Sequence, residues 1–154
     1  MRAMGAVLLL SGSAGLGLAA VRRLERRVTA LRSLTEALEL MERELDFRLP
    51  PMKELILETA RRSAEPASGF LRTCGERMDE LEGRPLSGLW RQAAVEKLPA
   101  LKNCELETLF SVGAVLGRYD GEGQRCAIAA ARERLTCILS EATDGADRAG
   151  CTAL

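Results

Sequence analysis

The chain has 154 residues, enough for one domain and a membrane anchor, and 47% are hydrophobic while only 3% are aromatic. The abundant alanine and leucine favour helices over strands. The formal net charge is zero, but residues 28–154 hold 17 basic and 21 acidic residues, and an acidic body argues against nucleic acid as the main partner.

The sequence contains few of the residues that usually serve in catalysis or metal binding. Histidine, the commonest general base and metal ligand, is absent. The five cysteines form no C-x-x-C pair, so they are typical of reduced, cytosolic thiols, and we expect most of them to be buried as small hydrophobic residues. They are Cys74, Cys104, Cys126, Cys137 and Cys151. We therefore predict no enzyme activity, no cofactor and no metal.

Residues 1–21 read as a transmembrane anchor. The 19 residues from Ala3 to Val21 carry no charge, and as a helix they would cover about 28 Å, close to the ~30 Å hydrocarbon core. Four arginines follow within six residues, which predicts that the body faces the cytoplasm. A cleaved signal peptide is the alternative, but its positive charge would stand mainly before the apolar stretch.

Small residues recur along this segment. Gly12, Gly15 and Gly17 lie here, and the pairs Ser11/Gly15 and Ser13/Gly17 are four apart, a spacing of small residues that lets membrane helices approach closely. The same run also resembles the glycine turn of a short-chain dehydrogenase. That family places its first two glycines four apart, whereas Gly12 and Gly15 are three apart. Its catalytic Tyr-x-x-x-Lys is also missing, because the residue four positions after the single tyrosine, Tyr119, is Gly123 and not lysine. We therefore favour membrane helix packing and a possible homo-oligomer.

Residues 22–143 are predicted to form a helical bundle. The first helix continues from the span to the double proline at residues 50–51 and carries leucines seven apart. They are Leu24, Leu31, Leu38 and Leu45, with Leu34 and Met41 between them. This seam fits packing against the other helices, or an intermolecular coiled coil; we favour the first.

Prolines and capping residues predict five further helices. They are opened by Pro51, by Pro66 with Ser68, by Ser87, by Asn103 and by Gln124, and the last ends near Ala142. The lone Trp90 is expected in the core. Residues 144–154 contain two glycines and no periodicity, and are predicted to be a disordered tail. The fold class is therefore all-α: an N-terminal transmembrane helix followed by a cytoplasmic bundle of about six helices.

Three segments follow one another in a set order. They are Met4-Gly-Ala-Val-Leu-Leu-Leu with Gly15-Leu-Gly and its arginine-rich exit, Leu38-Glu-Leu-Met-Glu-Arg-Glu-Leu before the double proline, and Leu116-Gly-Arg-Tyr-Asp-Gly-Glu-Gly-Gln. In this order and spacing they resemble the stage III sporulation protein AB family of endospore-forming bacteria. The third segment is similar to the family's Leu-Gly-x-Ser/Thr-Asp-x-x-x-Gln junction, from which Tyr119 departs. At this junction we expect Gly117, Arg118, Asp120 and Gln124 to fix the turn between the last two helices.

The resemblance, which covers residues 4 to about 142, implies a helical bundle and a function. Family members belong to the channel complex between mother cell and forespore, resemble part of a type II secretion platform, and are thought to meet the cytosolic ATPase stage III sporulation protein AA. The chain would then be a single-pass protein of the cell membrane, with its body in the mother-cell cytoplasm, other channel subunits as partners and no nucleic acid. A structural oligomerisation protein without ATPase docking is the alternative.

One departure from the family concerns the end of the chain. Family members usually end in a second apolar segment that returns to the membrane. Here the residues from Asp144 to Leu154 are too polar to span a bilayer. The expectation is either a truncated or frame-shifted chain, or a member with a single anchor.

Overall fold

The computed structural model describes residues 2–118 and 120–151, with side chains over residues 15–118 and 120–148. It contains six α-helices and one 3-10 turn in the described part, and no strand there. The helices are α1 (Arg2–Phe47), α2 (Met52–Arg62), α3 (Ala67–Arg77), η1 (Met78–Leu81), α4 (Leu86–Lys97), α5 (Asn103–Val115) and α6 (Gly121–Cys151). The all-α prediction is confirmed.

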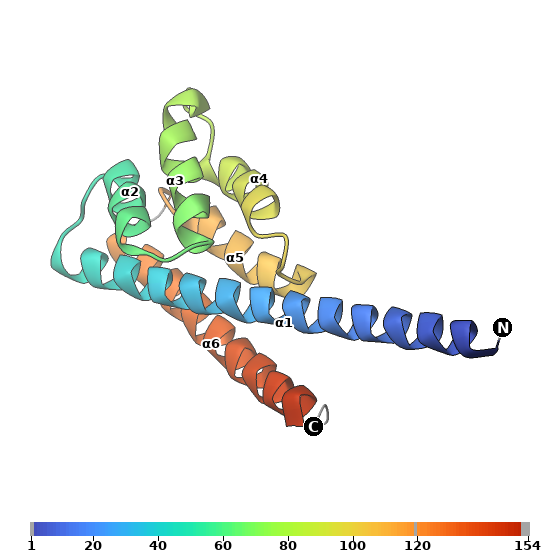
Figure 1. Cartoon of the computed structure of the whole chain (residues 1–154). Helices are drawn as coiled ribbons and strands as arrows, with labels where there is room; N and C mark the ends of the chain where they lie inside the picture. Colours follow the sequence, from blue (N-terminus) through green and yellow to red (C-terminus); the bar gives the residue numbers. More distant parts are fainter. Residues whose placement is uncertain (1, 119, 152–154) are drawn as a thin grey trace.

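Two long helices give the molecule its shape (Figure 1). Helix α1 is one rod of 46 residues, because no glycine or proline interrupts its second half. Helix α6 begins beside the far end of α1 and runs back along it, so that both chain termini lie on the same side. The shorter helices α2 to α5 pack over this pair and complete the bundle.

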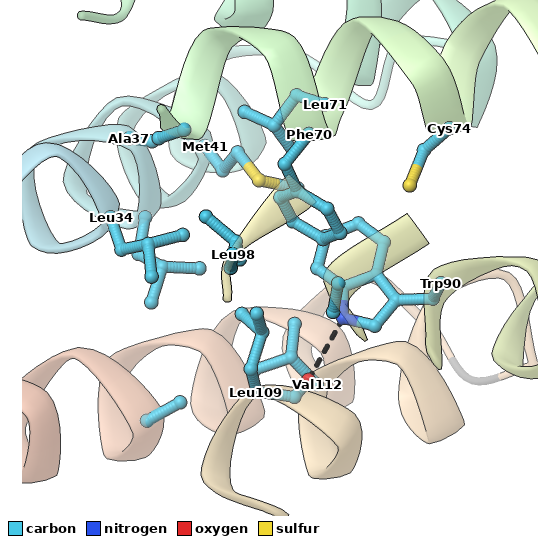
Figure 2. Packing of buried hydrophobic residues seen from close by; sticks show 14 of the residues in the cluster. Leu34, Ala37, Met41, Phe70, Leu71, Cys74, Trp90, Leu98, Leu109 and Val112 are labelled. Carbon is cyan, nitrogen blue, oxygen red and sulfur yellow. Dashed lines mark hydrogen bonds between the residues drawn. The ribbon is translucent and has the colours of Figure 1, made fainter. Parts of the chain in front are cut away.

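The core lies where α1 meets the shorter helices (Figure 2). The predicted heptad seam is buried inside the chain, since Leu31, Leu34 and Met41 are each at most 1% exposed. Phe70 of α3 and Trp90 of α4 fill the space opposite, with ring centroids 4.7 Å apart in an edge-to-face arrangement. The seam therefore packs against the other helices of the same chain, which is the favoured one of the two predicted alternatives.

Several boundaries differ from the prediction. The prediction of a cap at Ser87 is wrong, because α4 already begins at Leu86 after Pro85, whose fixed φ suits a helix entry. Asn103 is likewise the first residue of α5 and not its cap; Lys102 precedes the helix, and its N–H donates to Oε2 of Glu105 at 2.8 Å. The cap lies two residues earlier than predicted for α4 and one residue earlier for α5, within the usual uncertainty of helix ends.

The prediction of a disordered tail from Asp144 is wrong for residues 144–151, where α6 continues to Cys151. The glycine at position 145 argued for a tail, because glycine lowers the stability of a helix by about 1 kcal/mol relative to alanine. Alanine, the best helix former, recurs on both sides of that glycine, and the buried Ala142 ties α6 to the core just before it. Residues 152–154 lie outside the described part.

The cysteines also depart from expectation. Cys74 is buried in α3, and burial raises the pKa of its thiol to about 12, while Arg77 opposes that rise. Cys104, Cys126 and Cys137 are exposed, so the expectation of burial is wrong for them. Each falls on the solvent face of α5 or α6, where a free thiol is tolerated without packing.

Among the residues that the structure describes, no helix combines the length and the apolar character needed to cross a membrane. The predicted span covers residues 3–21, and the side chains of residues 3–14 lie outside the described part. The span stays a prediction from the sequence.

Candidate functional site

The predicted junction residues meet at the turn between α5 and α6. Gly117 has φ +78°, a left-handed conformation that glycine adopts at low cost and that reverses the chain after α5. The backbone N–H of Arg118 donates to the Val115 carbonyl at 3.1 Å. Tyr119 lies outside the described residues.

Asp120 caps the start of α6. Its Oδ1 accepts a hydrogen bond from the Gly123 N–H at 3.0 Å, and its carbonyl accepts from the Gln124 N–H at 3.1 Å. The carboxylate thus satisfies a helix N–H that would otherwise lack a partner, and its charge suits the positive end of the helix. Gln124, 9% exposed, is buried one turn into α6.

Replacing Asp120 by alanine is expected to lower the free energy of unfolding by about 0.5–2 kcal/mol, because a helix cap is lost. Thermal and urea unfolding followed by circular dichroism measure this loss. Glu133→Ala, at an exposed site of the same helix, is the control and should stay within about 0.5 kcal/mol of wild type. Unchanged melting of the Asp120→Ala chain, together with weaker partner binding, would instead assign Asp120 to a binding surface.

Of the glycines predicted to pack in the membrane, two are described with their surroundings. A Cβ added at Gly15 or at Gly17 would meet nothing within 4 Å, so both faces are open in the isolated chain. The side-chain surroundings of Gly12 lie outside the described part. The structure therefore leaves room for another helix at these positions, and their packing in a membrane stays a prediction.

A buried ion pair, which the sequence did not predict, ties α1 to α5. Glu105 is 0% exposed, and its Oε1 accepts a hydrogen bond from Nε of Arg27 at 2.9 Å and a second from Nη2. Its other oxygen accepts from the Lys102 N–H, so both oxygens of the carboxylate are satisfied. Arg27 belongs to the arginine cluster after the predicted span, but its role here is to hold the bundle together.

Two partly exposed ion pairs connect α1 to α6 further along. Arg132 and Arg125 of α6 bind Glu42 and Asp46 of α1 at 2.9 and 2.8 Å. The hydrogen bond with Asp46, aided by the charge of that carboxylate, raises the pKa of Arg125. These pairs join acidic side chains near the end of α1 to arginines of α6.

The paired long helices, the buried ion pair and the capped α5–α6 turn define an all-α bundle protein whose first and last helices leave it on one side. The family model described as Stage III sporulation protein AB matches residues 2–150. The chain therefore belongs to the stage III sporulation protein AB family, as the resemblance predicted, and it is a sporulation protein.

Comparison with solved structures agrees with this assignment at the level of the fold. The structure of a stage III sporulation protein AB matches with a TM-score of 0.68 and 23% sequence identity, over 79% of this chain and 97% of that chain. Among curated proteins, none matches this sequence.

Proposed function

We propose that the chain is a non-enzymatic, membrane-anchored platform component of the sporulation channel between mother cell and forespore, and that its bundle docks a cytosolic ATPase. Membership of the stage III sporulation protein AB family carries the proposal. In it, residues 3–21 form a membrane span, and the body faces the mother-cell cytoplasm.

The shape of the molecule supports this arrangement. The amino-terminal part of α1 projects beyond the shorter helices, and α6 ends on the same side (Figure 1). Arg22, Arg23 and Arg26 are exposed on α1 directly after the uncharged run, where they suit an anionic membrane surface. A chain anchored at this end presents the opposite end of its bundle to the cytosol.

Two experiments test the proposal. Alkaline carbonate extraction of membranes should leave the full chain in the pellet, and release into the supernatant would contradict the anchor. Purified in detergent, the full chain should retain the stage III sporulation protein AA ATPase of the same organism in a pull-down. Absence of binding at about tens of micromolar would exclude a stable dock, because an affinity that weak falls short of a specific platform contact.

A structural oligomer without ATPase docking is the second candidate. The open faces at Gly15 and Gly17 favour it: each glycine stands four residues after a serine, and small residues four apart allow close helix contact in a membrane. Analytical ultracentrifugation of the chain in detergent distinguishes the two. A stable oligomer that Gly15→Leu disrupts would support this candidate, whereas a monomer that binds the ATPase supports the first.

A further inference from the structure

Exposed large apolar side chains gather at one place outside the predicted span. Three of them, Leu16, Leu18 and Val21, lie within the span. Elsewhere Val95 stands singly, while Phe47 and Leu49 are close neighbours at the end of α1, 87% and 75% exposed. We call the segment from Leu45 to Pro50, with the first turn of α6 beside it, the distal tip.

The distal tip is hollowed on two sides of Phe47. One hollow, of about 510 Å³, lies between the end of α1 and the start of α6; the other, of about 730 Å³, lies between the end of α1 and α2. Leu49 packs against Gly121: a Cβ added at Gly121 would lie 2.3 Å from Cδ2 of Leu49. Phe47 therefore stands as an apolar projection between two concave surfaces, a shape that suits a partner with an apolar pocket.

The charge around the distal tip is negative on balance. Its two hollows are lined by six carboxylates and by only two guanidinium groups, those of Arg48 and Arg125. The carboxylates are Glu44, Asp46, Glu54, Glu58, Asp120 and Glu122. Arg61, Arg62 and Arg125 pair with four of these carboxylates, so six carboxylates stand against four arginines and two negative charges remain in excess. A partner with basic side chains around its apolar pocket would be complementary.

Charge and position argue against other occupants. A second copy of the chain would bring the same carboxylates face to face across a twofold axis, which costs energy through repulsion. An anionic membrane surface or a nucleic acid would be repelled for the same reason. The distal tip also lies where α1 ends and α6 begins, on the side away from both termini (Figure 1), and so away from the exposed arginines after the predicted span.

From these observations we infer that the distal tip is a docking surface for a protein partner that presents an apolar pocket ringed by lysine and arginine side chains. This inference rests on the proposed function in one respect, since the partner tested is the cytosolic ATPase. Phe47 and Leu49 enter the pocket, and the surrounding carboxylates orient the partner and speed its association.

The test compares the full chain with a Phe47→Ser/Leu49→Ser variant, in the same detergent, for binding to the stage III sporulation protein AA ATPase by biolayer interferometry. Val95→Ser is the matched control, because Val95 is a singly exposed residue of α4, 58% exposed. The distal-tip variant should bind about tenfold more weakly or worse, while the control matches wild type. Higher salt should weaken the wild-type complex. Both variants should melt like wild type, since they change exposed side chains.

The outcomes separate the inference from the function. If wild type binds and the distal-tip variant binds equally well, the inference is wrong and ATPase docking stands. If wild type does not bind at all, ATPase docking fails, and the assignment of this surface to that partner fails with it. If the variant instead abolishes a self-associated form seen by ultracentrifugation, the occupant is a second copy, contrary to the inference.

Discussion

Replacing Trp90 by alanine should lower the free energy of unfolding by about 3–5 kcal/mol, the range for removing a large buried aromatic side chain. Trp90 is 0% exposed, and its Nε1 donates a hydrogen bond to the Leu109 carbonyl at 2.9 Å (Figure 2). The indole joins Phe70 of α3 to α5, so its loss leaves a cavity where three helices meet. Urea unfolding followed by circular dichroism measures the change.

A milder variant keeps this prediction testable if the Trp90→Ala chain does not fold. A Cβ added at Gly113 of α5 would lie 2.4 Å from Cδ1 of Trp90. The indole ring is fully buried, so it cannot swing away to relieve this clash. Gly113→Ala is therefore expected to cost about 1–3 kcal/mol by overpacking. Since Trp90 is the single tryptophan, its fluorescence reports the same contact.

Gly88 of α4 supplies the control for Gly113. It is exposed, and an added Cβ would meet nothing within 4 Å. Gly88→Ala should therefore raise the free energy of unfolding by about 0.5–1 kcal/mol, because alanine restricts the unfolded chain more than glycine does. Equal effects of the two substitutions would show that the contact between Gly113 and Trp90 is not restrictive.

The sequence predicted what depends on periodicity. Leucines seven apart identified the buried face of α1, and paired prolines marked its end, because these signals are local and repeat along a helix. The same reasoning placed Trp90 in the core. Where a glycine interrupted the pattern, at Gly145, the reasoning ended the helix too early; a weak local preference was overridden by the continuing helix.

Contacts between distant segments were beyond that reasoning. Glu105 lies in the first turn of α5, but its partner Arg27 stands 78 residues earlier. Nothing in either neighbourhood distinguishes this pair from the many exposed charges. The exposed distal tip was not predicted for a similar reason. Phe47 lies at the end of a helix, where the packing of neighbouring segments decides whether an apolar side chain is covered.

Removing one partner of the buried Arg27–Glu105 pair should cost about 3–5 kcal/mol, because the other charge is left without compensation. Arg27→Met is the sharper variant. It strands the carboxylate of Glu105, which is 0% exposed, whereas Arg27 itself keeps some contact with water. Methionine retains most of the apolar stem of arginine, so the measured loss reports the charge and its hydrogen bonds.

A double variant tests the cause of that loss. In Arg27→Met/Glu105→Gln the amide oxygen can still accept from the Lys102 N–H, while no charge is buried; most of the lost stability should return. Arg43→Met is the matched control, since Arg43 pairs with Glu39 on the surface and should change the free energy of unfolding by less than about 1 kcal/mol. A double variant as unstable as Arg27→Met would mean that packing at this site matters more than its charge. If charge is the cause, this pair holds α1 to the bundle just after the predicted membrane span, and Arg27→Met should loosen α5 without changing the exposed distal tip.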